Sequence, residues 1–364
     1  MKYIPSYILW GWRAFGGLPL KITSGPKAHK ELTFSITGFI WSLVFFILQE
    51  ALSFIGMYIT ITRGRFGNEK NRPMQFSMIL DLVALQIMAA STFFSGTWKY
   101  SRIVDVFGKL DRIYRDLQYK NREVKIQVNV TVVSIVRTFL FIINYVKLMM
   151  NDTQVLIVVS YATFLFLECT LLAFLFHFTH VTQSITFAFK MVTDKMREQV
   201  ISSIIEPTVI DRSLADVAIF RTTSSTVSKI QQIKALMNTY WMLCDVVHKA
   251  NDFYCDQLMA VMLSLFVHVT VTSYFFFLHV RSGNVLDMTM DAIWVLVLIC
   301  YAILVVNSST EVTNWLNEFL LQSPHHNARF SARGFFKIHN ETLISMAGAA
   351  TNNLVVLIQF QTEK

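Results

Sequence analysis

Charged residues are scarce in this chain: Lys, Arg, Asp and Glu make up only 15% of its 364 residues, whereas 54% are hydrophobic. Soluble domains contain about 25% charged and about 45–50% apolar residues, so a set of soluble domains fits this composition poorly. Cysteine is also sparse, and paired spacings that would indicate a disulfide scaffold or a zinc site are missing. The four cysteines lie in or beside apolar stretches: Cys169, Cys244, Cys255 and Cys300.

Catalytic constellations are absent as well. The sequence has no Ser-His-Asp set, no glycine-rich phosphate loop and no pair of carboxylates placed for acid–base catalysis. The His177/His180 and His325/His326 pairs lack two further ligands at fitting spacing. We therefore expect no enzyme activity, no metal and no cofactor. The net charge of +8 does not indicate a nucleic-acid partner, because the basic residues lie between apolar runs rather than on one soluble face.

Long apolar runs dominate the chain instead. A helix needs about 20 mostly apolar residues to cross the hydrocarbon core of a bilayer. Seven segments meet this requirement: 33–58, 76–98, 131–150, 155–189, 257–280, 291–310 and 344–361. The sequence therefore predicts an all-α integral membrane protein with seven transmembrane helices.

The distribution of Lys and Arg predicts the orientation of these helices. Of the 32 basic residues, 24 fall in the segments on the N-terminal side of the spans. We expect a cytosolic N-terminus and an extracellular C-terminus. The first thirty residues show no apolar stretch with a cleavage site and are expected to be a cytosolic lead-in. This orientation, with no Asp-Arg-Tyr after the third span and no Asn-Pro-x-x-Tyr in the seventh, argues against a G-protein-coupled receptor.

Helices are expected to continue beyond the membrane on the cytosolic side. The run 155–189 is apolar for about 52 Å of helix, more than a bilayer needs. Segment 224–256 carries apolar residues at helical spacing and should feed the fifth span, and 311–323 repeats this pattern after the sixth. Residues 198–223 contain Pro207 and many small polar residues, which predicts a loose linker.

The predicted organisation has two parts. Residues 1–310 hold the N-terminal segment and helices one to six with the ligand-pocket region, and the cytosolic loop and helix 190–256 lie within them. Residues 311–364 hold a cytosolic anchor helix and the seventh span.

The stretch 330–360 contains a Gly334-Phe335-Phe336 turn, five apolar residues at 354–358 and a final Gln359-Phe360. It resembles the signature region of insect gustatory receptors, although Asn352-Asn353 replaces the Thr-Tyr pair of that family. The stretch 237–259 is similar to the helix that leads into the fifth span of the same family, with Asn251, Phe253 and Gln257 at its recurrent positions. The resemblance implies a ligand-gated cation channel in the plasma membrane, a homotetramer or a heterotetramer with related subunits. The last helix would line the pore, and a small tastant would bind in a pocket that opens outward between spans two and six.

The last span itself carries a polar stripe. Asn352, Val356 and Gln359 recur at i, i+4 and i+7 and share one helix face, which is costly against lipid. In a symmetric assembly this face, with Phe360 at its end, would line a water-filled path, with Val356 as a dewetting constriction and Gln359 offering carbonyls to cations. Alternatively, the amides hydrogen-bond to neighbouring helices.

An aromatic wall with a few polar side chains marks the expected ligand pocket in the outer halves of the middle spans. The candidate residues are Asp81, Gln86, Asn144, Tyr145, Ser160, Tyr161, Phe164, Tyr274, Phe276, Asp291 and Trp294. The same aromatic residues also suit plain helix packing. This set is thin in carboxylates and amides for a sugar, which favours a bulkier, bitter-type tastant.

Two further charges, Arg137 and Glu168, lie at similar depths in neighbouring spans and are predicted to form an intramembrane ion pair. The alternative is that each side chain extends separately toward the membrane surface. Other functions stay open at this point: a sugar-sensing member of the same family, an odorant-receptor-like subunit that needs a partner, and a secondary transporter. Internal repeats and broken helices, which a transporter predicts, are not visible in the sequence.

Overall fold

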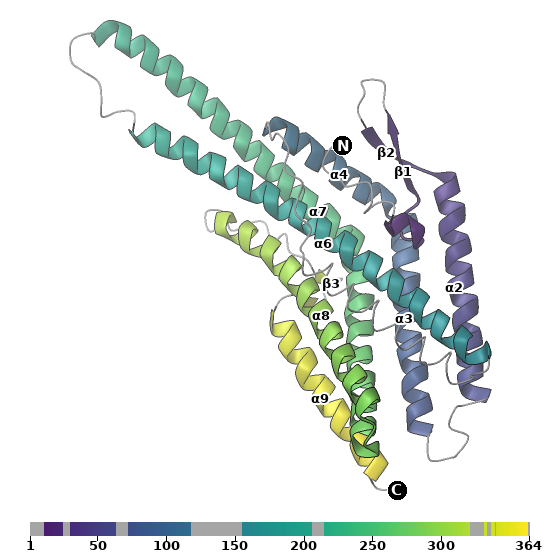
Figure 1. Ribbon diagram of the computed structural model, residues 1–364. Coiled ribbons are helices and arrows are strands. Elements are labelled where there is room, and N and C mark those ends of the chain that lie inside the picture. The colour runs from purple at the N-terminus through teal and green to yellow at the C-terminus, as the bar shows by residue number, and fades with distance from the viewer. Residues whose placement is uncertain are drawn as a thin grey trace.

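The protein folds into a bundle of long helices with two short β-hairpins (Figure 1). The structure, a computed structural model, describes residues 11–24, 30–62, 72–117, 155–205, 215–320, 331–332, 336–338 and 340–362. Its helices are α2 (Ile36–Thr62), α3 (Arg72–Trp98), α4 (Tyr100–Asp116), α6 (Val155–Ile205), α7 (Ala215–Ser282), α8 (Val285–Leu320) and α9 (Asn340–Thr362). The predicted helical fold class is confirmed for this part of the chain.

Six helices in the described residues are long and apolar enough to cross a membrane, and they coincide with six of the seven predicted spans. The third predicted span, 131–150, lies outside the described residues. The side of the membrane on which each end lies stays a prediction from the basic residues.

Two helices are much longer than a membrane span and run without a break. α6 runs for 51 residues and α7 for 68, so each is far longer than a bilayer requires. Their extensions, residues 190–205 of α6 and 215–256 of α7, run together and are called the arm below (Figure 1). The base of the arm, residues 240–256 of α7, is packed against the bundle, and its far end projects from it. α8 likewise continues through the predicted anchor helix to Leu320.

The loose linker predicted for 198–223 is wrong at both ends, because α6 continues to Ile205 and α7 already begins at Ala215. Serine and threonine lower helix propensity only slightly. Extending a formed helix by one residue costs much less than nucleating a new one. The small polar residues therefore continue the two helices; Pro207 lies outside the described residues.

The first span begins later than predicted because its expected first residues belong to a hairpin. β1 (Leu20–Ser24) pairs antiparallel with β2 (Lys30–Phe34), and Leu20 faces Phe34 while Ile22 faces Leu32. These four residues form one apolar face. Leu20 and Leu32 are buried, and the Phe34 ring lies 4.9 Å from that of Tyr100 on α4. A second, smaller hairpin joins β3 (Ser331–Ala332) to β4 (Phe336–Lys337) ahead of α9.

The face of α2 that packs against the bundle is polar, and its exposed face is apolar. Ser42, Gln49 and Ser53 are buried, whereas its large apolar side chains, among them Trp41 and Ile47, are exposed. Inside, the Gln49 side-chain amide donates to the Thr170 hydroxyl of α6 at 3.4 Å. This distribution suits a helix with one face against lipid, where hydrogen bonds to neighbouring helices stabilise the bundle.

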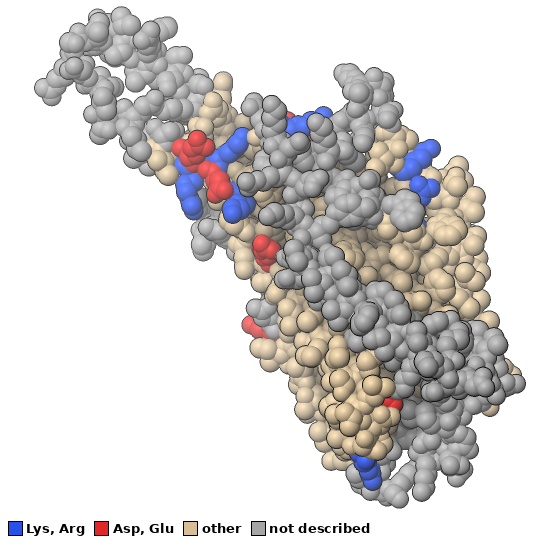
Figure 2. All heavy atoms as spheres, viewed as in Figure 1, with Lys and Arg blue, Asp and Glu red and all other residues tan. Residues whose placement is uncertain are grey.

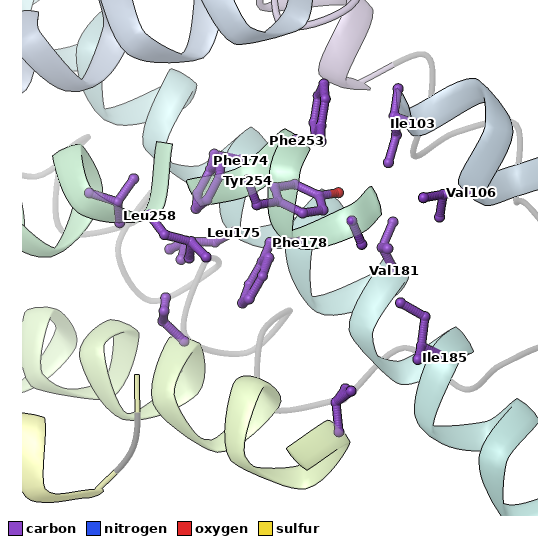
Figure 3. Close-up of a cluster of buried hydrophobic side chains, with 14 of the residues drawn as sticks. Ile103, Val106, Phe174, Leu175, Phe178, Val181, Ile185, Phe253, Tyr254 and Leu258 are labelled. Atoms are coloured by element: carbon purple, nitrogen blue, oxygen red, sulfur yellow. The ribbon is translucent and has the colours of Figure 1, made fainter. Parts of the chain in front are cut away.

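The apolar core lies where α4, α6 and α7 meet (Figure 3). Aromatic side chains of α6 and α7 interlock there, with the Phe178 ring 5.1 Å from the Tyr254 ring and the Phe253 ring 4.9 Å from it. Ile103 and Val106 of α4 close the cluster on one side. This core joins the arm to the rest of the bundle.

The segment before β1 docks closely on this core. Trp12 is almost fully buried and packs against His177 and Phe253. The backbone of Gly17 approaches α3 so closely that a Cβ on Gly96 would lie 2.0 Å from its carbonyl oxygen. Only glycine at position 96 permits this contact.

Candidate ligand pocket and pore helix

Three helices meet at a buried polar cluster formed by Asp81, His268 and Trp294. Asp81 lies on the third turn of α3, His268 on α7 and Trp294 on α8. The His268 Nδ1 is 2.5 Å from an Asp81 carboxylate oxygen, and the Trp294 indole N–H donates to the His268 Nε2 at 2.9 Å. Asp81 and His268 are each only 5% exposed. Two of the predicted pocket residues are thus brought together by a histidine.

The hydrogen bonds define the protonation of this cluster. An indole N–H only donates, so the His268 Nε2 must accept and carries no proton. The Nδ1 of the ring then donates its proton to Asp81, a tautomer assigned from the bonds around the ring. The two bonds thus fix the orientation of the His268 ring between α3 and α8.

Glu168 of α6 lies on the other side of the same histidine. Its Oε1 is 3.6 Å from the His268 Nε2, and the residue is 5% exposed. The ion pair predicted between Glu168 and Arg137 stays a prediction, because Arg137 lies outside the described residues. The cluster thus connects α3, α6, α7 and α8.

Gln86, also predicted for the pocket, contacts a different helix. Its side-chain amide donates to the Glu50 carboxylate of α2 at 3.3 Å. Nearby on α2, the Leu52 carbonyl accepts from the Thr163 hydroxyl of α6 at 3.0 Å. Gln86 therefore ties α3 to α2 and lies in a second polar layer.

Asp291 lies near the turn that connects α7 to α8. It is on the second turn of α8 and accepts from the His279 Nδ1 of α7 at 2.6 Å. α7 thus carries two histidine–aspartate pairs, one near this turn and one at Asp81. Eleven residues separate His279 from His268, which is about 16 Å along a helix.

The aromatic candidates are distributed differently. Tyr274 is fully buried, Phe164 is partly buried against the apolar core, and Phe276 is partly exposed. Asn144 and Tyr145 lie outside the described residues. Ser160 and Tyr161 lie on the first turns of α6, where side chains are not described.

The predicted pore residues lie on α9, which packs against α7 and α8. None of the residues in its apolar stretch Glu341–Gln359 is buried within the single subunit. Asn352, Val356 and Gln359 are all exposed, and the side chain of Phe360 is not described. One subunit therefore leaves the polar stripe of α9 uncovered.

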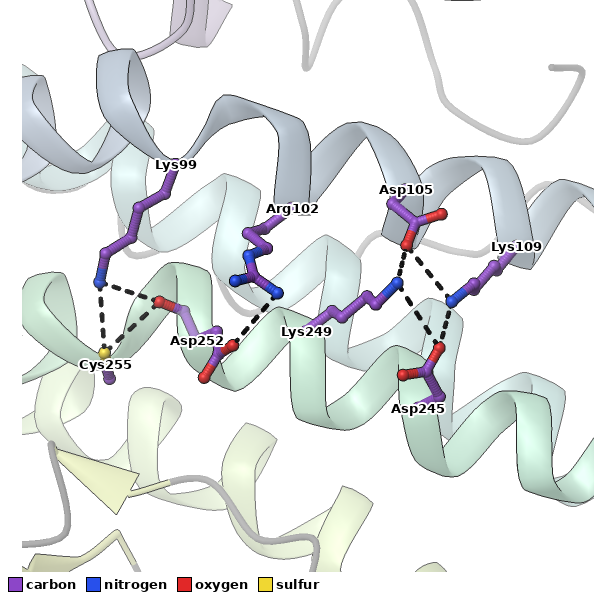
Figure 4. A network of polar contacts seen from close by, with 8 residues as sticks. All are labelled: Lys99, Arg102, Asp105, Lys109, Asp245, Lys249, Asp252 and Cys255. Carbon is purple, nitrogen blue, oxygen red and sulfur yellow. Dashed lines mark hydrogen bonds and ion pairs between the residues drawn. The ribbon is translucent and has the colours of Figure 1, made fainter.

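A ladder of ion pairs joins α4 to the base of the arm (Figure 4). Lys99 pairs with Asp256 at 2.7 Å and Arg102 with Asp252 at 3.6 Å. Farther along, Asp105 and Lys109 of α4 form a four-membered network with Asp245 and Lys249 of α7. On the face seen in Figure 2, charged side chains gather in this region, and the bundle below it is mostly uncharged.

The ladder changes the acidity of its members. Partial burial raises the pKa of Asp105, but hydrogen bonds and charges of Lys249 and Lys109 outweigh it, and the pKa lies below its ordinary value of 3.8. Burial likewise opposes the charged form of Lys109, yet Asp245 and Asp105 raise its pKa above 10.5. Both groups are charged at neutral pH.

Sequence reasoning missed His268, His279 and Glu50. Each is an ionisable residue inside a predicted apolar span or at its end. An ionisable residue in such a span indicates a functional or paired site, which is the reason for the prediction at Arg137 and Glu168. Among the described residues, no three His, Cys, Asp or Glu side chains are placed to hold a metal ion.

Comparison with known proteins places these features in a family. A family model described as 7tm Chemosensory receptor matches residues 6–315 and 305–364. Gustatory receptor 68a of Drosophila melanogaster is 28% identical over 159 residues, which cover 35% of this chain and 41% of the relative. Gustatory and pheromone receptor 32a of the same species is 43% identical over 53 residues, covering 15% and 12% of the two chains. The alignments thus span less than half of each relative.

Solved structures match over nearly the whole chain. The insect olfactory receptor OR5 from Machilis hrabei superposes with a TM-score of 0.64, covering 98% of this chain and 97% of that chain. The same receptor in complex with eugenol gives a TM-score of 0.60 with the same coverage. At 11% identity, these similarities show the fold alone.

Proposed function

Since the chain belongs to the 7tm chemosensory receptor family, we propose that it is a taste receptor that acts as a ligand-gated, non-selective cation channel. The family assignment and the gustatory relatives make it an insect chemosensory receptor of the gustatory type, a multi-pass protein of the plasma membrane. The channel activity, the tastant and the assembly are the proposal.

The exposed polar stripe of α9 is the observation that carries the proposal. Asn352 and Gln359 are exposed amides on a helix whose stretch Glu341–Gln359 has no buried residue, and a polar face of this kind is expected to face water rather than hydrocarbon. Four subunits arranged around one axis would turn these stripes toward water. Val356 would then form the constriction and Gln359 a ring of carbonyls for cations.

The pocket and the pore belong to two parts of the chain. Residues 1–310 carry the pocket, with the arm on the cytosolic side as an anchor between subunits, and residues 311–364 carry the end of α8 and the pore helix. The proposed pocket centres on Asp81, Trp294 and His268, a choice that the hydrogen bonds among these three side chains support. We propose a small, bitter-type tastant as its ligand; the complex of the related-fold receptor OR5 with eugenol supports a ligand of this size.

The test is whole-cell current from cells that express this chain alone, challenged with bitter compounds and sugars. We expect a cation current evoked by a bitter compound and altered by Gln359→Ala. Asn353→Ala is the matched control, because it makes the same kind of change about 100° around the helix from Asn352.

Other outcomes identify the alternatives. If surface-expressed protein carries no current alone but does so with a related subunit, the chain is a partner-dependent subunit, as the Asn352-Asn353 replacement allows. Current evoked by sugars alone identifies a sugar receptor. Uptake of a compound without any gated current identifies a transporter.

A further inference from the structure

One carboxylate, that of Glu341, lies in line with the polar stripe of α9. We infer that Glu341 determines the preference of the proposed pore for cations over anions, by forming a ring of carboxylates at the mouth where α9 begins. This inference rests on the channel proposed above and assigns its charge selectivity to one residue.

The first step is the position of Glu341 along the helix. It precedes Gln359 by 18 residues, about five full turns, so the two residues lie on one line parallel to the axis of α9. At 1.5 Å per residue this line is about 27 Å long, close to the thickness of the hydrocarbon core. The residues along it are all exposed: Glu341, Ser345, Gly348, Asn352, Val356 and Gln359.

The second step is the direction in which this line faces. The opposite side of α9 packs on its own subunit, where Leu343 and Met346 contact the hydrophobic core and Ala350 is partly buried. Ala350 is nine residues from Glu341, which is about 180° around the helix. Glu341 therefore lies on the side of α9 that faces away from its own subunit. Four subunits around one axis would turn four such carboxylates toward the shared path.

The third step is the sign of the charge. Glu341 is the only ionisable residue in the stretch Glu341–Gln359. Four helix N-termini around a pore mouth would present the positive ends of their dipoles and repel cations. A carboxylate in the first turn of each helix opposes this repulsion, and a ring of carboxylates concentrates cations at the entrance.

The experiment measures the reversal potential of the ligand-evoked current in a NaCl gradient, with a related subunit present if the current requires one. We expect the wild type to reverse near the Na⁺ equilibrium potential. In Glu341→Gln the ratio of cation to anion permeability should fall about tenfold, the lower end of electrostatic focusing. Glu341→Lys should shift the reversal potential farther toward that of Cl⁻, whereas Glu341→Asp should behave like the wild type.

Ionic strength separates an effect of charge from an effect on folding, because an acidic residue in the first turn also stabilises the helix itself. The single-channel conductance of Glu341→Gln should fall farthest below that of the wild type at about 0.01 M salt, where the Debye length is about 30 Å. At about 1 M salt the Debye length is about 3 Å, and the two conductances should converge. A distorted helix would instead lower the conductance at every salt concentration.

Glu341→Cys allows the charge to be restored on one protein. Modification with sulfonatoethyl methanethiosulfonate, which adds a negative charge, should return the preference for cations. The trimethylammonium reagent of the same type adds a positive charge and should reduce the preference further. The wild type treated in the same way is the control for the native cysteines.

Two further variants control for charges elsewhere. Glu198→Gln removes an exposed carboxylate from α6, which contributes no residue to the proposed pore, and should leave the reversal potential unchanged. Lys337, on β4, is the nearest lysine in the sequence, and its side chain is not described. Since Lys337→Gln removes a positive charge, it should leave the preference for cations unchanged or raise it; a decrease would contradict an electrostatic effect.

Two results would overturn the assignment to Glu341 while the channel proposal stands. In the first, Glu341→Lys reverses at the same potential as the wild type. In the second, Glu341→Asp loses the preference for cations as fully as Glu341→Gln, so that the charge is not the cause. A surface-expressed wild type that carries no current, either alone or with a related subunit, would reject the channel and this inference together.

Discussion

Trp294 of α8 donates its indole N–H to the Nε2 of His268 on α7, and this bond determines that the imidazole proton faces Asp81. Trp294→Phe keeps an aromatic ring but leaves the buried Nε2 without its donor, which costs about 1–3 kcal/mol. We expect a lower midpoint of thermal unfolding and weaker ligand binding. Trp98→Phe is the control, since Trp98 is 77% exposed and its replacement should change the midpoint little.

The constriction proposed at Val356 predicts a leak when it becomes polar. Val356→Ser should hydrate the narrowest ring and raise the current measured without ligand. Val355→Ser makes the same change one residue away, about 100° around α9, and should leave the basal current low. Equal leaks from both variants would contradict a single pore-lining face.

Gly96 allows the backbone of Gly17 to contact α3, and any side chain at position 96 would prevent this contact. Gly96→Ala places a methyl group 2.0 Å from the Gly17 carbonyl oxygen, so α3 and the N-terminal segment must separate. We expect a loss of stability of about 1–3 kcal/mol and less receptor at the cell surface. Gly108→Ala on α4, with no atom within 4 Å of its added Cβ, should instead stabilise by about 0.5–1 kcal/mol.

The ladder between α4 and α7 can be tested by exchanging charges. Arg102→Asp or Asp252→Arg alone places like charges opposite each other, whereas the double variant restores an ion pair in reverse. Both side chains are partly exposed, so we expect a coupling energy of only about 0.2–1 kcal/mol. A double-mutant cycle of unfolding midpoints measures it, and the coupling should shrink at high salt.

The pH dependence of the ladder follows from Asp105. Because its folded-state pKa lies below 3.8, its stabilising contribution is present above that value and is lost as the pH falls through the folded pKa. The difference in unfolding midpoint between the wild type and Asp105→Asn should therefore be constant from about pH 5 to 8 and shrink below about pH 4. A difference that disappears already near pH 6 would point to a histidine instead.

The spans could be predicted from the sequence because a bilayer imposes one strong requirement, about 20 apolar residues in a row. The residues at which the helices begin and end could not be predicted in this way. Phe34 is apolar enough for a span, but pairing with Leu20 keeps it in a hairpin. The residues after Lys195 resemble a linker in composition, yet α6 already exists there and continues to Ile205.

The polar cluster around His268 could be predicted in part for a similar reason. Asp81, Asp291 and Trp294 stand out as polar or amphipathic residues in apolar runs. Their partners depend on which helices touch, and hydropathy does not predict that α3 packs on α7 so that Asp81 meets His268. Likewise, the sequence does not predict that α2 packs on α3 so that Gln86 meets Glu50.

Because α7 is long, a small tilt of this helix produces a large displacement at its far end. At 1.5 Å per residue its 68 residues span about 102 Å, of which a bilayer core takes about 30 Å. About 70 Å of lever therefore lies outside the hydrocarbon. A tilt of about 5° at the membrane edge moves the far end of the arm by about 6 Å, more than one helical turn. The same tilt displaces residues within the bilayer by at most about 2.6 Å, at the far side of the hydrocarbon core. Fluorophores at exposed arm positions such as Gln231 would therefore report a ligand's effect at Asp81 more sensitively than labels in the pocket itself.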